Sequence, residues 1–175
     1  MAFGMMRPMP QIQTFSPEHT EGVVRLILPI QQQEFGIAIT ADAQPDLRDI
    51  PGFYQHGAGN FWIALDGDEV VGSIALLDIG NGQAALRKMF VRASHRGREH
   101  GVAAALLATL LEHASAKGLR EIYLGTTDKF LAAHRFYEKH GFVQVPREAL
   151  PEAFPVMAVD SVFYALRLSP ARGSA

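Results

Sequence analysis

The sequence contains no cysteine. This absence excludes a disulfide framework, a zinc–thiolate site and a cysteine nucleophile. A strong charge of one sign is also lacking: the formal net charge is −2 over 175 residues. Such a balance provides no long-range attraction to nucleic acid or to an anionic membrane, so neither is expected as a partner. Without a need for disulfides, a cytoplasmic location is the plain expectation.

Long apolar runs and nucleotide-binding motifs are absent as well. The apolar stretch Val102–Leu111 is far shorter than the ~20 residues that cross a bilayer. Residues 1–10 are apolar but contain a glycine and two prolines and no basic leader, so a secretory signal is not expected. Neither G-x-G-x-x-G after a strand nor G-x-x-x-x-G-K-S/T occurs, and the histidine spacings predict no metal site.

The length of 175 residues suits one domain with its own hydrophobic core. We expect flexible ends at residues 1–11 and 169–175 and a single domain over residues 12–168. The predicted order is strand, two helical segments, a meander of three antiparallel strands, then helix, strand, helix and two strands. A meander joined to a βαβ unit predicts an α/β fold, with a mixed central sheet and helices on both faces.

Turn and cap signals locate these elements. Ser16 followed by proline predicts a helix start, and the Asp66-Gly67 and Asn81-Gly82 pairs predict hairpin turns. Residues 41–54 are predicted as a shorter helical or irregular piece that two prolines interrupt. The predicted strands cover residues 12–15, 61–65, 70–78, 84–91, 121–124, 142–145 and 162–168, and the clearest helices cover 101–117 and 129–140.

A glycine-containing loop leads from a predicted strand directly into the helix at residues 101–117. Arg98, Gly101 and Ala103 give an R-x-x-G-x-A spacing. The first N–H groups of a helix lack internal partners and carry partial positive charge, and small side chains let a diphosphate approach them. Five basic residues near this loop would suit a ligand with a diphosphate and a further phosphate: Arg87, Lys88, Arg92, Arg96 and Arg98. A solvated surface segment explains the loop equally well.

The segment after the next predicted strand has a more specific pattern. Residues Ala133–Phe142 read A-x-x-F-Y-E-K-x-G-F, which resembles a signature of the GNAT superfamily of N-acetyltransferases. It follows the R-x-x-G-x-A loop by one strand–helix step, as in that family. The resemblance covers residues 74–145, and two motifs in this order are more specific than either one alone.

This resemblance implies acetyl-CoA as co-substrate and a splayed pair of parallel strands, at residues 86–91 and 121–124, that holds the pantetheine arm. Tyr137 would stand near the thioester sulfur as proton or hydrogen-bond donor, with His134 one turn earlier on the same helical face. Phe130 departs from the family, which often has asparagine there. The implied cofactor-binding residues are Met89, Phe90, Val91, Arg96, Gly97, Arg98, Glu99, His100, Gly101, Val102, Ala103, His134 and Tyr137.

The sequence indicates least clearly which residue deprotonates the acceptor amine. An alkylammonium with a pKa near ~10.4 is about one part in a thousand free amine at neutral pH, so a carboxylate, a histidine or a water chain must help. The acidic residue that some family members carry on the fourth strand is missing. Glu34, on the segment that walls the acceptor site in the family, is the leading candidate. Asp42, Asp46, His56 and His95 are weaker ones, and each of the five could equally be a solvated surface group.

The predicted function is acetyl transfer from acetyl-CoA to a primary amine of a small metabolite, by direct attack in a ternary complex. A protein lysine or N-terminal acetyltransferase stays open, as does a non-catalytic acyl-CoA-binding module in which Tyr137 is only structural. A closed acceptor pocket built by residues 29–54 and 150–160 would favour the metabolite. Pairing of the strand at residues 162–168 across a two-fold axis would allow a homodimer.

Overall fold

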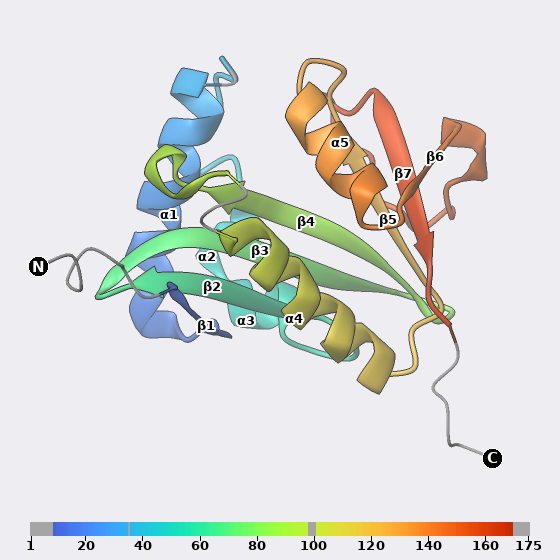
Figure 1. The fold of residues 1–175 in the computed structure, drawn as a ribbon, viewed down its shortest axis with the longest axis horizontal. Helices are drawn as coiled ribbons and strands as arrows, with labels where there is room; N and C mark the ends of the chain where they lie inside the picture. Colours follow the sequence, from blue (N-terminus) through green and yellow to red (C-terminus); the bar gives the residue numbers. More distant parts are fainter. Residues whose placement is uncertain (1–8, 35, 98–100, 170–175) are drawn as a thin grey trace, which may run out of the picture.

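One mixed sheet organises the protein. In the computed structural model, which describes residues 9–34, 36–97 and 101–169, the strand order is β1-β2-β3-β4-β5-β7-β6 (Figure 1). Among the described strands, β4 and β5 are parallel and the other neighbours are antiparallel, which confirms the predicted α/β fold. The strands are β1 (Gln11–Thr14), β2 (Asn60–Asp66), β3 (Glu69–Gly80), β4 (Gln83–Val91), β5 (Glu121–Thr126), β6 (Val143–Val145) and β7 (Val162–Arg167).

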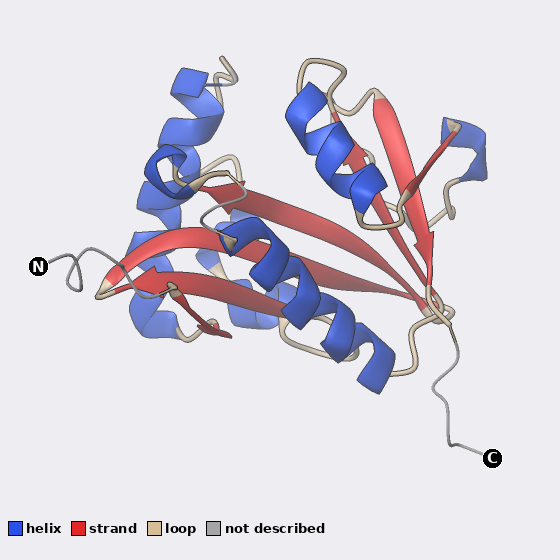
Figure 2. Cartoon of the chain, in the orientation of Figure 1, coloured by secondary structure: helices blue, strands red, loops and turns tan. Residues whose placement is uncertain are grey.

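Helices cover both faces of this sheet (Figure 2). The helices are α1 (Thr20–Pro29), which continues as a π-helical turn at Ile30–Glu34, α2 (Pro45–Arg48), α3 (Ile50–Tyr54), α4 (Val102–Ala116) and α5 (Leu131–Lys139). On one face, side chains of α1, α2 and α3 form a core with β2 and β3. On the other face, α4 and Tyr137 of α5 share a core with β2 to β5. No helix within the described ranges has both the length and the apolar character that crossing a membrane requires.

Local signals predicted most elements correctly, with one correction in the proline-containing segment. Asn81 and Gly82 have φ values of 57° and 71°, as a two-residue hairpin turn between β3 and β4 requires. Pro45 and Pro51, which were predicted to interrupt a helix, instead stand in the first turns of α2 and α3. The first turn tolerates proline because its N–H groups have no helical partner.

The two C-terminal strands do not follow chain order. β7 lies between β5 and β6 and pairs with both. Residues 163–165 of β7 therefore have strand partners on both sides within one chain, and the pairing of this strand across a two-fold axis stays a prediction. The predicted flexible ends fall mainly on residues outside the described ranges, although Gln11 already belongs to β1.

The parallel strands β4 and β5 separate soon after they meet (Figure 1). They pair only at Gln83–Ala85 with Glu121–Tyr123, whereas β4 continues to Val91 and β5 to Thr126. This is the splay that the family resemblance implied.

A β-bulge in β4 shapes the same region. Ser73 pairs with Phe90 and Ala75 with Arg87, so Ile74 of β3 faces two residues of β4. One of them, Lys88, has a φ of 53°, which is uncommon for a residue with a side chain. The Ser73 hydroxyl donates a hydrogen bond of 2.7 Å to the Lys88 carbonyl oxygen, which supports this conformation.

The bulge changes which face the side chains of β4 occupy. In a regular strand, neighbouring side chains point to opposite faces. Here the Arg87 guanidinium stacks on Phe53 and Tyr54 of α3, and the Lys88 ammonium reaches Asp46 of α2. Two adjacent cationic side chains therefore lie on the same face, the one that α1, α2 and α3 cover.

Candidate active site

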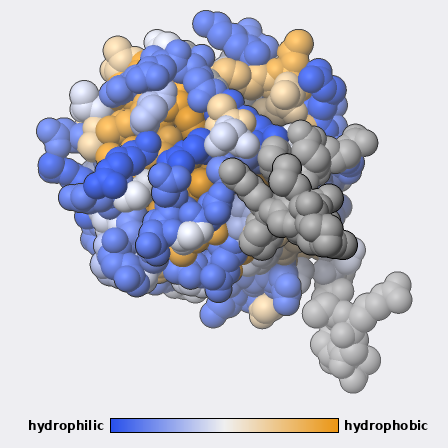
Figure 3. Space-filling model, turned by 60° about the vertical axis from the view of Figure 1, so that its left-hand side comes forward, coloured by the Kyte–Doolittle hydropathy of each residue, from blue (hydrophilic) through white to orange (hydrophobic). Residues whose placement is uncertain are grey.

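A cavity of about 660 Å³ opens where β4 and β5 separate. Met89 and Tyr137 line it and belong to the core on the α4 face, whereas Ile30 and Phe90 line it and belong to the core on the α1 face. The cavity thus connects the two faces of the sheet. In the space-filling view, one face of the molecule shows apolar side chains recessed between hydrophilic rims (Figure 3).

The backbone of β4 forms one wall of this cavity. Beyond Ala85, β4 remains paired with β3 up to Val91 but has no described pairing with β5. Met89, Phe90 and Val91 all line the cavity. Because β4 has no neighbouring strand among the described residues on this side, an extended ligand that carries amide groups can lie along it.

Tyr137 lies in the cavity wall at the side of α5. Its side chain is buried at 7% exposure and packs on Phe142 and Tyr164, with ring centroids 5.6 and 6.0 Å away. Its hydroxyl has no hydrogen bond to the described residues, yet it is not sealed from the cavity. Burial raises the pKa of Tyr137 well above its ordinary value. The phenol therefore stays protonated at neutral pH and can donate a hydrogen bond to a bound ligand.

The buried phenols predict a loss of stability in alkali. Burial raises the pKa values of both Tyr54 and Tyr137, whereas in the unfolded chain phenols ionise near ~10. Above pH ~10 the unfolded state thus binds fewer protons, and the free energy of unfolding should fall by up to ~1.4 kcal/mol per pH unit for each phenol. Burial lowers the pKa of Lys88, which acts in the opposite sense, but its contribution is complete by about pH 10.4.

Urea unfolding at pH 8, 9, 10 and 11 measures this loss. The Tyr54→Phe variant removes one of the buried phenols, so its stability should fall less steeply between pH 10 and 11 than that of the parent. Equal slopes for the two proteins would contradict the prediction.

Arg96 and Glu34, predicted for the cofactor and the acceptor sides, bind each other. The Arg96 guanidinium contacts the Glu34 carboxylate at 2.6 and 3.0 Å, and its Nε donates to the Val91 carbonyl oxygen at 2.7 Å. Arg96 lines the cavity and Glu34 does not. This two-point contact joins the end of the π-helical turn to the chain that follows β4, and it occupies the carboxylate that was predicted as base.

The loop between β4 and α4 is positioned by the β2–β3 hairpin. His95 contacts Asp66 at 2.8 Å, and the Arg92 guanidinium contacts Glu69 at 2.7 Å. Gly101 precedes α4 with a φ of 64°, a conformation that glycine adopts without strain. The α4 start at Val102 and Ala103 is as predicted, whereas Arg98, Glu99 and His100 lie outside the described residues.

The predicted basic cluster does not gather at this loop. Arg92 pairs with Glu69, and the β4 bulge turns Arg87 and Lys88 toward the face of α1, α2 and α3. The alternation of side chains along a regular strand cannot predict that Arg87 and Lys88 lie on one face, because the bulge adds one residue to β4.

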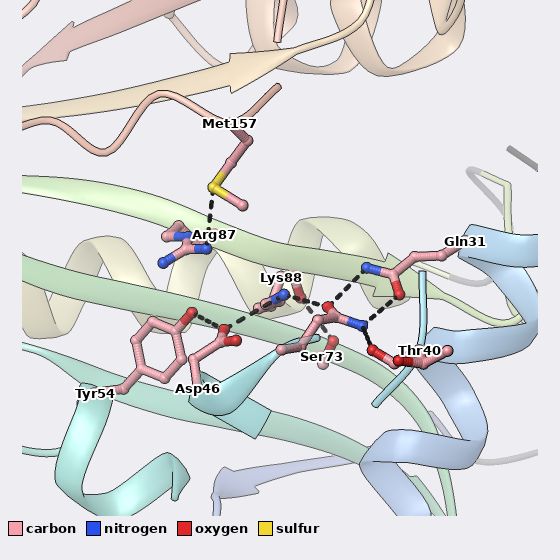
Figure 4. Close-up of polar contacts among 9 residues, drawn as sticks. Gln31, Thr40, Asp46, Tyr54, Ser73, Arg87, Lys88 and Met157 are labelled. Carbon is pink, nitrogen blue, oxygen red and sulfur yellow. Dashed lines mark hydrogen bonds and ion pairs between the residues drawn. The ribbon is translucent and has the colours of Figure 1, made fainter. Parts of the chain in front are cut away.

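A buried polar network surrounds the Lys88 ammonium (Figure 4). Lys88 Nζ lies 2.7 Å from Gln44 Oε1 and 3.4 Å from Asp46 Oδ2, and the side chains of Lys88 and Asp46 are only 8% and 6% exposed. The Tyr54 hydroxyl donates to Asp46 at 2.6 Å, and the side-chain amides of Gln31 and Gln44 bond reciprocally. Asp46, one of the weaker base candidates, is therefore the counter-ion of a buried lysine.

The remaining candidates from the sequence lie outside the cavity wall. His134 Nε2–H donates to the Thr127 carbonyl oxygen at 2.7 Å and its ring packs on Tyr164. Asp42 forms an ion pair with Arg48. Neither these residues nor His56 and His95 line the cavity. Across the described part of the chain, no group of three or more histidine, aspartate or glutamate residues could hold a metal ion.

Asp160 is the one carboxylate that lines the cavity among the described residues, and sequence reasoning missed it. It ends a tight turn in which its carboxylate accepts the Met157 N–H at 2.9 Å, and the next residue, Ser161, bonds the Thr126 carbonyl oxygen at the end of β5. Burial raises the pKa of Asp160. No motif marks this residue; only its place between the end of β5 and the start of β7 brings it to the cavity.

Comparisons with known proteins agree with this architecture. N-acetyltransferase family 8 member 2 of Rattus norvegicus is 35% identical over 104 residues, which are 57% of this chain and 45% of that protein. N-acetylaspartate synthetase of Danio rerio is 33% identical over 129 residues, which are 71% of this chain and 45% of that protein. The chain therefore spans about half the length of the curated relatives it matches.

Solved structures match over nearly the whole chain. A GNAT acetyltransferase of Staphylococcus aureus Mu50 has a TM-score of 0.86 and 36% identity, covering 91% of this chain and 99% of that one. An N-acetylglutamate synthase of Neisseria gonorrhoeae, solved with coenzyme A and N-acetylglutamate, has a TM-score of 0.69 at 15% identity, covers 94% of this chain and 36% of that one, and shares the fold alone. Residues 25–142 match the acetyltransferase (GNAT) family as a whole, and the chain belongs to that family.

Proposed function

We propose that this chain transfers an acetyl group from acetyl-CoA to the primary amine of a small molecule, by direct attack of the amine in a ternary complex. The observation that carries the proposal is the cavity through the sheet, where the open side of β4 meets Tyr137. Membership of the acetyltransferase (GNAT) family supports acetyl transfer as the reaction.

The cavity suits acetyl-CoA as the donor substrate. Pantetheine carries amides that can pair with the backbone of Met89 to Val91. The free N–H groups at the start of α4, with Gly97, Gly101 and Ala103 keeping side chains small, would receive the diphosphate. Arg96, paired with Glu34, lies in the wall between these two parts. His134 is left out of this set, because it does not line the cavity and its ring nitrogen is hydrogen-bonded to the Thr127 carbonyl oxygen.

The backbone of β4 and the Tyr137 hydroxyl act at different atoms of the thioester. The amine attacks the thioester carbon, and N–H groups on the open side of β4 stabilise the oxyanion that forms, which is worth about 3–4 kcal/mol for a well-placed donor. The leaving thiolate, with a pKa near ~8.5, accepts a hydrogen bond from Tyr137. Because burial raises the pKa of this phenol further, Tyr137 acts by hydrogen bonding more than by complete proton donation.

The residues that line the cavity support a small acceptor. Ile30, Gln31 and Ile37 line it from the segment after α1, and Val159 and Asp160 line it from the segment before β7. These are the two segments expected to form a closed acceptor pocket. Among the relatives, N-acetylaspartate synthetase is named for a small acetylated product, which supports the same choice.

Thermal unfolding with and without ligand tests the donor. At ~100 times the dissociation constant, bound acetyl-CoA adds ~2.7 kcal/mol, which should raise the midpoint of a protein of this size by about 5–10 °C. Coenzyme A should produce a similar rise and ATP none. The Ala103→Glu variant, which places a carboxylate where the diphosphate would bind, should lose the rise; Ala108→Glu, at an exposed position of the same helix, should keep it. No rise with millimolar acetyl-CoA would refute the proposal.

A further inference from the structure

The cavity contains two charged side chains, Arg87 and Asp160, that lack an ion-pair partner among the described residues. Two other cations of the cavity wall have ion-pair partners: the buried Lys88 pairs with Asp46, and the exposed Arg96 pairs with Glu34. Lys129 also lines the cavity but is exposed to solvent at the rim. The uncompensated charge therefore consists of one guanidinium on β4 and one carboxylate before β7.

Arg87 is held in place by contacts other than an ion pair. Its guanidinium carbon lies 5.7 Å from the ring centre of Phe53 and 5.9 Å from that of Tyr54, and one of its N–H groups points to the Met157 sulfur at 3.6 Å (Figure 4). A guanidinium has five N–H donors, and a thioether is a weak acceptor. Arg87 is thus fixed in orientation, while most of its donors remain open to a ligand with two acceptor oxygens.

Asp160 is fixed from the opposite wall. One of its carboxylate oxygens accepts the Met157 N–H, and the backbone around it is tied to the end of β5 through Ser161 and Thr126. Its other oxygen has no bond to a described residue. The positive charge of Arg87 acts on Asp160, as does that of Arg147, yet neither forms an ion pair with it. Both residues line the same cavity, so a ligand bound there can meet both charges.

We infer that Arg87 and Asp160 form the acceptor subsite, and that the acceptor is an amino acid with a free carboxylate and a primary ammonium group. The carboxylate binds the Arg87 guanidinium through two parallel hydrogen bonds, and the ammonium binds Asp160. This assignment rests on the proposed function, because only acetyl transfer gives the bound amine a reaction.

The same arrangement supplies the base that the sequence did not reveal. The ammonium transfers one proton to the Asp160 carboxylate, and the free amine attacks the thioester carbon of acetyl-CoA. The new C–N bond forms as the C–S bond breaks. The second nitrogen proton is lost as the amide forms, the thiolate takes up one proton to become the thiol, and Asp160 returns its proton to solvent. One proton is released for each acetyl group transferred.

The test compares the twenty common L-amino acids with their primary carboxamides as acceptors, with acetyl-CoA as donor and thiol release as readout. We expect at least one amino acid to be acetylated with a kcat/KM about 10- to 100-fold above that of its carboxamide. In the Arg87→Gln variant the two kcat/KM values should differ by no more than twofold, because only the value for the amino acid falls. Arg87→Lys should be intermediate, because it keeps the charge but not the planar fork.

A control variant and a variant of the proposed base complete the test. Arg25→Gln, an exposed arginine on the outer side of α1, should leave the preference unchanged. Asp160→Asn should lower kcat/KM for the amino acid by about 10²-fold near neutral pH, and the deficit should shrink as the pH approaches the pKa of the acceptor amine. A merely structural role of Asp160 would give a deficit that does not depend on pH.

The acetyl-CoA-dependent rise in the unfolding midpoint, measured on the parent and on Arg87→Gln, distinguishes a failure of the acceptor assignment from a failure of the proposed function. If the midpoint rises in both proteins but carboxamides are acetylated as well as amino acids, the acceptor assignment is overturned and acetyl-CoA binding stands. The same holds if the midpoint rises in both and no amino acid is acetylated. No rise in the parent overturns the proposed function and the assignment with it. Persistence of the carboxylate preference in Arg87→Gln overturns the role of Arg87.

Discussion

The Tyr137→Phe variant should lose about 10²- to 10³-fold in kcat, because it loses one hydrogen-bond donor to the developing thiolate, while its affinity for acetyl-CoA stays unchanged. The Tyr137 hydroxyl has no hydrogen bond to a described residue, so its removal leaves no protein group unsatisfied. The folded state should therefore remain at least as stable as the parent. Only the departing thiolate loses a partner. Steady-state kinetics by thiol release, together with the acetyl-CoA-dependent rise in the unfolding midpoint, measures both halves of this expectation.

Tyr164→Phe provides the matched control for this result. Tyr164 belongs to the same aromatic cluster but does not line the cavity, and its hydroxyl donates to Glu138 at 2.8 Å. We expect this variant to lose about 1–2 kcal/mol of stability with kcat within twofold of the parent. If Tyr137→Phe kept kcat within threefold, Tyr137 would be a structural residue, and the non-catalytic acyl-CoA-binding alternative would gain support.

Replacing Asp46 with asparagine should lower the free energy of unfolding by about 3–5 kcal/mol, because it leaves the buried Lys88 ammonium without its counter-ion. For a chain of this size that loss lowers the unfolding midpoint by about 6–20 °C. The same carboxylate accepts the Tyr54 hydroxyl, so the substitution also weakens a second buried hydrogen bond. Urea unfolding at pH 7 measures the change.

A double-mutant cycle shows whether charge pairing causes this loss. Adding Lys88→Met to Asp46→Asn removes the unpaired charge, so the double variant should regain most of the lost stability. Asp42→Asn, which breaks the exposed pair with Arg48, should cost less than about 1 kcal/mol. Additive effects of the Asp46 and Lys88 substitutions would contradict the assignment of Asp46 as counter-ion.

Elements with local signals could be predicted from the sequence. The hairpin turn at Asn81-Gly82, the helix that begins after Gly101 and the helix that carries Tyr137 each have caps or turn residues within a few positions. The splay of β4 from β5 and the place of Tyr137 followed from the family resemblance, because two motifs in order define one strand–helix–strand unit.

Features that depend on distant partners could not be predicted in this way. The bulge that turns Arg87 and Lys88 to one face depends on the register between β3 and β4. Asp160 enters the cavity only because its turn is tied to the end of β5. The contact of Glu34 with Arg96 joins residues 62 positions apart, and no periodicity within either segment indicates it.

The interior position of β7 has a consequence for biosynthesis. β5 and β6 have β7 as their shared neighbour, and in the described part of the fold β6 pairs with no other strand. While the chain emerges from the ribosome, the sheet from β1 to β5 has all of its residues well before the last strand is made. β5 and β6 must wait without β7, a state that exposes strand edges to aggregation. Asp160 lies two residues before β7, and Tyr137 packs on Tyr164 of that strand. The walls that we assign to the donor and to the acceptor would therefore both depend on the insertion of β7.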